Sequence, residues 1–172
     1  GGALFVAGCG DHGVRRAVPA RRASAPMAGS GEGGDADGVG DAAQFYNPSG
    51  IAISRDGGAL FVADQSNHKI RRVEVATGAV TTLAGSGTRG SADGVGGAAQ
   101  FSRPIGVALS PDGSSLLVRA GGSLRQVCVA APPPPPSFAP IVVPPSTLVA
   151  DLKKMRGDAS LPHGPVTFIV GD

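Results

Sequence analysis

The chain has 172 residues and a formal net charge of +2, with 28 glycines, 15 prolines, two cysteines and no tryptophan. This charge is too small to predict nucleic-acid binding by electrostatics, and no apolar run approaches the roughly 18 residues that cross a membrane. Cys9 and Cys128 match no metal-ligand or redox spacing and make no disulfide framework. We therefore expect a reducing compartment, either cytoplasmic or nuclear.

An internal repeat with a spacing of 56 residues organises residues 1–130. The phrase "GGALFVA" occurs at residues 1–7 and again at 57–63, and "ADGVG" at 36–40 returns at 92–96. After residue 119 the register shifts by two, so that "KIRRVEV" at 69–75 matches "SLRQVCV" at 123–129. Repetition at such a period is the signature of a propeller, a solenoid or an array. Because the first residues already lie inside a recurring phrase, we expect a fragment with both ends cut.

Within one copy the apolar residues alternate with a period of two and are separated by turn residues such as "RDGG" and "QSNH". This pattern predicts a four-stranded antiparallel meander over residues 50–84. The side chains expected to fill its buried faces are Ile51, Ile53, Leu60, Val62, Ile70 and Val73. The first copy supplies its last three strands and the third copy its first three. The sequence therefore predicts an all-β fold, a partial β-propeller of about 2.5 four-stranded blades that does not close a ring.

The middle copy, "NPSGIAISRDGGALFVADQSNHKIRRVEVATGAVTTLAG", resembles an NHL repeat in its P-x-G-[IV]-A opening, its VAD-x-x-N-H-x-I-R centre and its G-x-V-T-T-L-A-G end. The resemblance covers residues 1–130 and implies a propeller that binds protein or RNA. Few aromatic residues and the weak charge argue against RNA. The third copy departs from the motif, because "VADQSNHKIRRV" has become "VRAGGSLRQV". We expect that copy to be a degenerate blade.

Two glycine-rich connectors, residues 32–44 and 88–100, join successive copies. The "GDADGVGD" stretch of the first offers three carboxylates at calcium-loop spacing, Asp35, Asp37 and Asp41. Two of them are replaced in the second connector, where the equivalent residues are Ser91, Asp93 and Gly97. We therefore predict no metal site, and expect irregular surface loops of matching conformation. Phe45 and Phe101, which follow the connectors, are expected to fill the spaces between blades.

The "ADQSNHKIRR" stretch holds the main candidate site residues. We interpret Asp64, Asn67 and His68 as structural turn residues, since Asn67 can bond its neighbouring backbone and the histidine recurs between copies. Arg71 and Arg72 are the candidate partner-binding residues: they point to opposite faces of a strand, so that one of them can meet an acidic partner. A solvated edge strand is the alternative. We identify no catalytic residues, no phosphate loop and no cofactor site.

The remaining chain has a different composition. Residues 131–145 are rich in proline, which predicts a polyproline II linker, with a signalling-domain ligand as the alternative. Residues 146–172 predict a short helix, with a cap at Ser146 or Thr147 and a stop at Gly157, followed by an alternating strand. The apolar residues of the helix and strand are Leu148, Leu152, Met155, Val166, Phe168 and Val170. The order of helix and "VTFIVGD" resembles the start of a BTB/POZ domain.

Two classes of function follow. The first is a protein-interaction scaffold, in which the blades bind a protein partner. The BTB-like segment implies in addition a dimer mate or a cullin-type ubiquitin ligase. The alternative is a metal-dependent hydrolase resembling the six-bladed gluconolactonases or strictosidine synthases. Such enzymes need inward carboxylates from several blades, and metal analysis of the full-length protein discriminates between the two classes.

Overall fold

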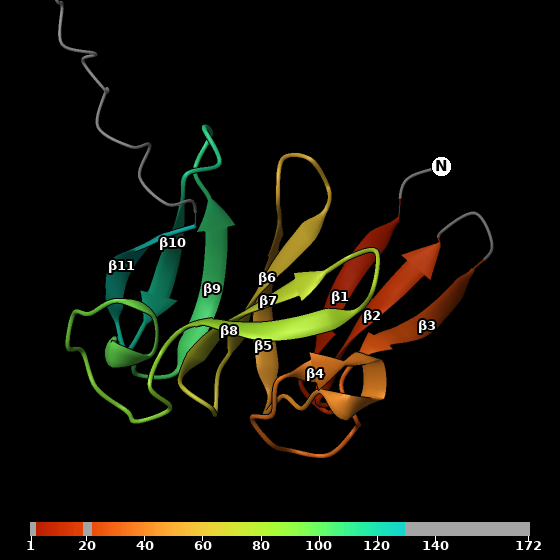
Figure 1. Cartoon of the computed structure of the whole chain (residues 1–172), viewed down its shortest axis with the longest axis horizontal. Coiled ribbons are helices and arrows are strands. Elements are labelled where there is room, and N and C mark those ends of the chain that lie inside the picture. The colour runs from red at the N-terminus through yellow and green to blue at the C-terminus, as the bar shows by residue number, and fades with distance from the viewer. Residues whose placement is uncertain (1–2, 19–21, 130–172) are drawn as a thin grey trace, which may run out of the picture. The chain divides into compact units, whose positions relative to one another are not determined.

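The computed structural model describes residues 3–18 and 22–129, which form three antiparallel sheets standing side by side (Figure 1). The first sheet contains β1 (Leu4–Gly8), β2 (Gly13–Val18) and β3 (Ala23–Ala28). The second contains β5 (Pro48–Ile53), β6 (Ala59–Asp64), β7 (Lys69–Glu74) and β8 (Ala79–Ala84), with β4 (Gly38–Val39) beside β8. The third contains β9 (Pro104–Leu109), β10 (Ser115–Ala120) and β11 (Ser123–Cys128). The predicted all-β fold is confirmed.

The linker predicted at 131–145 and the helix and strand predicted within 146–172 lie outside the described residues. Within the described ranges, no helix reaches the length and apolarity that a membrane crossing needs.

The meander predicted for residues 50–84 is confirmed, with β5, β6, β7 and β8 paired in sequence order. Leu60, Val62, Ile70 and Val73 are fully buried, as predicted. The prediction for Ile53 is wrong: this last residue of β5 precedes a solvated turn and is 46% exposed. Ile51 is only partly buried, although it packs against the neighbouring core.

Two apolar clusters fill the spaces between sheets, and each contains one of the two connector phenylalanines. The first seam lies between the first and second sheets and consists of Val14, Ala28, Ala43, Phe45, Leu60, Val62, Val73 and Val80. The second seam lies between the second and third sheets and consists of Phe61, Ala63, Ile70, Ala84, Ala99, Phe101, Leu116, Val118 and Ala120. Phe45 and Phe101 are 0% and 2% exposed, so their predicted position is confirmed. Burying each ring contributes about 1.5–3 kcal/mol.

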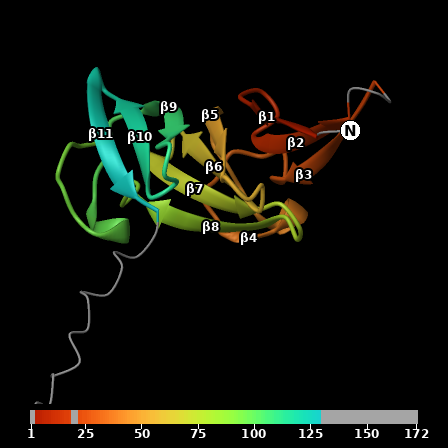
Figure 2. The same ribbon diagram turned by 90° about the horizontal axis from the view of Figure 1, so that it is seen from above.

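Neighbouring sheets also meet along their first strands, where β5 lies against β9 (Figure 2). A Cβ atom added at Gly50 would lie 2.8 Å from the Cα atom of Gly106 and 2.8 Å from the carbonyl oxygen of Ile105. The hydroxyl of Ser49 donates to the same carbonyl oxygen at 3.2 Å. The two strands therefore approach backbone to backbone.

The two connectors match in conformation, as predicted. The amide N–H of Gly29 donates to the carbonyl oxygen of Gly40, and Gly85 donates to Gly96, both at 3.0 Å. Each connector contains one short 3-10 helix, η2 (Gly40–Ala42) or η3 (Gly96–Ala98).

The prediction of a wholly irregular connector is nevertheless wrong for the first one, because its residues 38–39 form β4 on the free edge of β8. The equivalent Val95 is 92% exposed, and the described part of the third sheet has no strand in the position of β8. A connector strand thus forms where a fourth strand of the next sheet is present.

Candidate functional site

Asp64 ends β6 with its side chain fully buried and with three hydrogen bonds to its carboxylate. The Tyr46 amide N–H and the Asn67 side-chain amide donate at 2.8 Å, and Arg71 donates at 2.9 Å. Burial raises the pKa of Asp64, while these three donors oppose the rise. The Asn67 amide also donates to the Gly34 carbonyl oxygen at 2.6 Å. The hydrogen bonds of Asp64 and Asn67 therefore join the β6–β7 turn to the first connector.

His68 and His12 occupy equivalent places and accept the same kind of hydrogen bond. The Nδ1 atom of His68 accepts from the Arg103 amide N–H at 3.0 Å, and that of His12 accepts from the Asn47 amide at 3.2 Å. Arg103 and Asn47 each lie just before the first strand of the next sheet, so each hydrogen bond links one sheet to the next. Burial lowers the pKa of His68, and the charges of Arg89 and Arg103 act in the same direction. A neutral imidazole, which the acceptor role requires, is thereby favoured.

Arg71 lies buried, with a side chain that is 0% exposed. Its two terminal nitrogens donate to the carbonyl oxygens of Gln44 and Ala36, both at 2.9 Å. They also pair with Asp64 at 2.9 Å and with Asp37 at 2.7 Å. Because every one of these partners belongs to the protein interior or to the first connector, the surface role expected for Arg71 is replaced by a structural one.

Arg72 lies beside it with a side chain that is 40% exposed, in an ion pair with Glu74 of the same strand. Of the two arginines proposed to contact a partner, only Arg72 reaches the surface.

The third sheet repeats the arginine–connector contact, which we did not predict from the sequence. Arg125 donates to the carbonyl oxygens of Gln100 and Ala92 and pairs with Asp93 of the second connector. Its guanidinium lies 5.1 Å from the centroid of the Phe101 ring, just as Arg71 lies 5.2 Å from that of Phe45. The recurrence of Ala-Asp-Gly after 56 residues, and of Arg in the register that is shifted by two after residue 119, was the available signal.

Two of the three carboxylates at calcium-loop spacing, Asp35 and Asp37, have cationic partners. Asp35 pairs with Lys69 at 2.7 Å, which lowers the pKa of Asp35, and Asp37 pairs with Arg71. Over residues 3–18 and 22–129, no three His, Cys, Asp or Glu side chains lie together as a metal-binding group.

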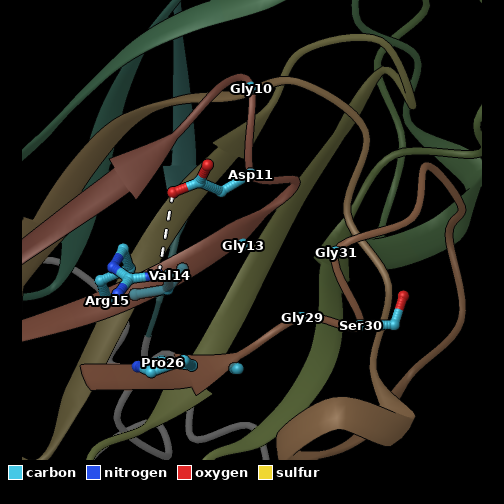
Figure 3. A pocket seen from close by; sticks show the side chains of 10 residues that line it. Gly10, Asp11, Gly13, Val14, Arg15, Pro26, Gly29, Ser30 and Gly31 are labelled. Carbon is cyan, nitrogen blue, oxygen red and sulfur yellow. Dashed lines mark ion pairs between the residues drawn. The ribbon is translucent and has the colours of Figure 1, made fainter.

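Arg15 is the counterpart of Arg71 in the first sheet, and it lines a cavity of about 380 Å³ (Figure 3). The residues around this Arg15 pocket are Gly10, Asp11, Gly13, Val14, Arg15, Pro26, Ala28, Gly29, Ser30 and Gly31. The Arg15 side chain is 36% exposed, and its described partners are Asp11 at 3.8 Å and the Ser24 hydroxyl at 3.4 Å. A second cavity, of about 320 Å³, lies between the second connector and β11.

The first sheet has an exposed apolar outer face, whereas the equivalent face of the second sheet is buried. Leu4 and Val6 of β1 are 58% and 51% exposed. Their counterparts in the repeat, Leu60 and Val62, are both 0% exposed in the first seam. Val6 lies opposite Arg15 in the strand register, so this outer face, defined by Leu4, Val6 and Arg15, is continuous with the Arg15 pocket.

Comparison with known proteins gives these sheets a family context. Residues 45–72 match the NHL repeat. The NHL repeat is shared with NHL repeat-containing protein 2 of Homo sapiens, which is 37% identical to the chain over 86 residues, 49% of this chain and 12% of that protein. Protein SUPPRESSOR OF QUENCHING 1, chloroplastic, of Arabidopsis thaliana is 32% identical over 131 residues, 74% of this chain and 12% of that protein. The chain thus spans about an eighth of the length of these relatives.

A solved structure shows the same fold at low identity. An auxiliary nutrient binding protein from Bacteroides thetaiotaomicron superposes with a TM-score of 0.62 and 22% identity, over 73% of this chain and 34% of that protein. The match places the NHL repeat of residues 45–72 within a propeller-like arrangement of sheets.

Proposed function

We propose that this chain is a protein-interaction module that binds through the outer face of its first sheet. The observation that carries the proposal is the contrast between exposed Leu4 and Val6 and fully buried Leu60 and Val62 at equivalent positions. In the second sheet this surface packs against a neighbouring sheet and its connector. The outer face of the first sheet has the same chemistry and, among the described residues, no such cover.

The partner is therefore a protein with an apolar sheet face, rather than a small molecule. Contiguous apolar side chains on a sheet are stabilised when a complementary surface removes them from water, by about 25 cal/mol for each Å² of apolar area. NHL repeats generally build propellers that bind protein partners, which supports the same reading.

The outer face is tested by differential capture with the whole chain as bait. A Leu4→Lys and Val6→Lys double variant is compared with the wild type and with a Val95→Lys control, in which a still more exposed valine of the second connector is changed. We expect the double variant to lose a partner that the wild type and the control retain. Thermal unfolding verifies that all three proteins fold alike, and an identical set of partners for all three would overturn the proposal.

In a finer form, Arg72 contributes to the partner surface and residues 146–172 begin a BTB/POZ-like domain that recruits a dimer mate or a cullin-type ubiquitin ligase. The partial exposure of Arg72 supports the first part, and the "VTFIVGD" sequence supports the second. Sedimentation equilibrium of the protein extended beyond Asp172 tests the second part: a dimer is expected, and an extended protein that stays monomeric at all concentrations argues against it. We assign no residue to the hydrolase alternative.

A further inference from the structure

We propose that His68, Arg89, Ser102 and Arg103 form a binding site for the phosphoryl group of a phosphorylated protein segment. These residues lie in the β6–β7 turn, in the second connector and just before β9. The surface named under the proposed function lies on the first sheet instead. The inference therefore goes beyond the proposed function and does not depend on it.

Hydrogen bonds bring the four residues together. The Nδ1 atom of His68 accepts from the Arg103 amide N–H at 3.0 Å, and the Nε atom of Arg89 donates to the Ser102 hydroxyl at 3.0 Å. Arg89 also forms a β-bridge with Phe101, the residue before Ser102. Three segments that are distant in the sequence thus meet at one point of the surface.

The site carries two positive charges that no carboxylate neutralises in the part of the chain that the structure describes. Arg89 and Arg103 are exposed, and neither has an ion pair there. Lys69, next to His68 in the chain, already pairs with Asp35 at 2.7 Å. The charges of both arginines act on the His68 imidazole, so both lie near the same ring. Two such cations repel each other, and a bound anion relieves the repulsion.

The donors in the site favour a ligand that only accepts hydrogen bonds. Because Nδ1 of His68 accepts, Nε2 carries the ring proton and can donate. The hydroxyl of Ser102 accepts from Arg89 and keeps its own proton for a ligand. A phosphomonoester carries about −1.5 to −2 charges at pH 7, which matches two arginines. A carboxylate or a phosphodiester carries a single charge and would leave one arginine without a partner.

The first copy of the repeat lacks both cations at the equivalent positions. The counterparts of Arg89 and Arg103 are Gly33 and Asn47, and the Nδ1 atom of His12 accepts from the Asn47 amide N–H at 3.2 Å. The bond between histidine and backbone therefore forms without the arginines. Arg103 has a φ of 50°, a left-handed conformation that asparagine adopts more readily than arginine. The backbone does not explain why arginine stands at this position, whereas anion binding does.

Nuclear magnetic resonance of the whole chain tests the site with three probes. These are inorganic phosphate, a short phosphoserine peptide, and the same peptide with glutamate in place of phosphoserine, at about pH 7.5 and constant ionic strength. We expect saturable amide shifts at residues 68, 88–90 and 102–103, with a Kd for phosphate on the order of 1–10 mM, because solvent and salt screen an exposed site. The phosphoserine peptide should bind at least about 5-fold more tightly than the glutamate peptide. The ring signal of His68 should move, and that of His12 should not.

Variants of the chain locate the site. Arg89→Gln and Arg103→Asn should each weaken phosphate binding about 5- to 10-fold, because each removes charge-assisted hydrogen bonds. Arg103→Asn introduces the residue that the first copy has at the same place, so the fold is retained. Arg16→Gln is the matched control: it removes another exposed arginine, in β2, and should bind like the wild type. Melting temperatures without phosphate verify that all variants fold alike.

The inference fails if phosphate and the phosphoserine peptide cause no saturable shifts at these residues, if the two peptides bind equally well, or if Arg16→Gln weakens binding as much as Arg103→Asn. A single-stranded RNA oligonucleotide is a fourth probe. Tighter binding of the RNA than of the phosphoserine peptide would assign the site to nucleic acid and overturn the assignment to a protein. The proposed function is judged separately, because its test changes only Leu4 and Val6.

Discussion

Arg15 and Arg71 occupy equivalent positions in the first and second sheets, yet the Arg15 side chain is 36% exposed and that of Arg71 is 0% exposed. The strand that precedes each arginine has the same Leu-Phe-Val-Ala sequence, at residues 4–7 and 60–63. The difference arises because residues 34–44 of the connector cover Arg71, whereas nothing described covers Arg15. A connector that leaves one copy of the repeat thus buries the arginine of the next copy. The stability of each sheet therefore depends strongly on its interface with the neighbouring copy.

The largest expected effect comes from removing the covered arginine. Arg71→Gln leaves buried Asp64 without its cation, and the free energy of unfolding should fall by about 3–5 kcal/mol. Arg15→Gln removes an exposed ion pair and should cost less than about 0.5 kcal/mol. Urea denaturation measures both. Arg71→Lys, which keeps a charge but loses the forked donors, should lie between them, and similar losses at positions 15 and 71 would contradict the comparison.

The apolar counterparts should differ in the same way. Leu60→Ala removes a fully buried side chain from the first seam and should cost about 2–5 kcal/mol, whereas exposed Leu4→Ala should cost under about 0.5 kcal/mol. Both substitutions replace a leucine by an alanine, so the two variants have the same amino-acid composition. Thermal unfolding followed by circular dichroism gives the comparison, and a large loss for Leu4→Ala would show that the outer face is covered in solution.

A smaller difference separates the two connectors. The Asp37 side chain is 49% exposed and accepts hydrogen bonds from Arg71 and from the amide and hydroxyl of Thr82, whereas Asp93 is 98% exposed and pairs with Arg125. Asp37→Asn should therefore cost about 1–2 kcal/mol and Asp93→Asn no more than about 0.5 kcal/mol. Urea midpoints of the two variants test the order, and the reverse order would contradict it.

The smallest effect is a pH dependence at His68, which lies in the turn between β6 and β7. The pKa of His68 is lowered in the folded protein, so below the ordinary value of 6.5 the unfolded chain binds a proton that the native state does not. Stability from this residue is present above that pH and is lost as the pH falls through it. His68→Asn keeps a residue suited to the positive φ of 56° but does not titrate. Melting temperatures at about pH 7.5 and 5.5 should differ less in the variant than in the wild type.

The features that depend on local sequence pattern could be predicted from the sequence. Alternation and turn residues located β5 to β8, and recurrence placed Phe45 and Phe101 in the seams. The burial of Arg71 was missed because strand alternation shows only that Arg71 and Arg72 lie on opposite faces of the sheet. It does not show which face is covered by a connector that is distant in the sequence. β4 was missed for a similar reason, since Val39 pairs with Ala79, which lies far along the chain. Ile53 was misplaced because the pattern cannot show where a neighbouring sheet ends.

The close approach of Gly50 to Gly106 sets the angle at which consecutive sheets fan out. Because Gly50 carries a hydrogen in place of a side chain, β5 and β9 approach backbone to backbone, while phenylalanine-sized groups in the seams keep the strands farther along each sheet apart. A methyl group at position 50 would widen the inner spacing and make neighbouring sheets more nearly parallel. The angle between neighbouring sheets determines how many sheets complete a ring. Replacing the Gly50 hydrogen by a methyl group would therefore change the number of blades in any ring built from this repeat.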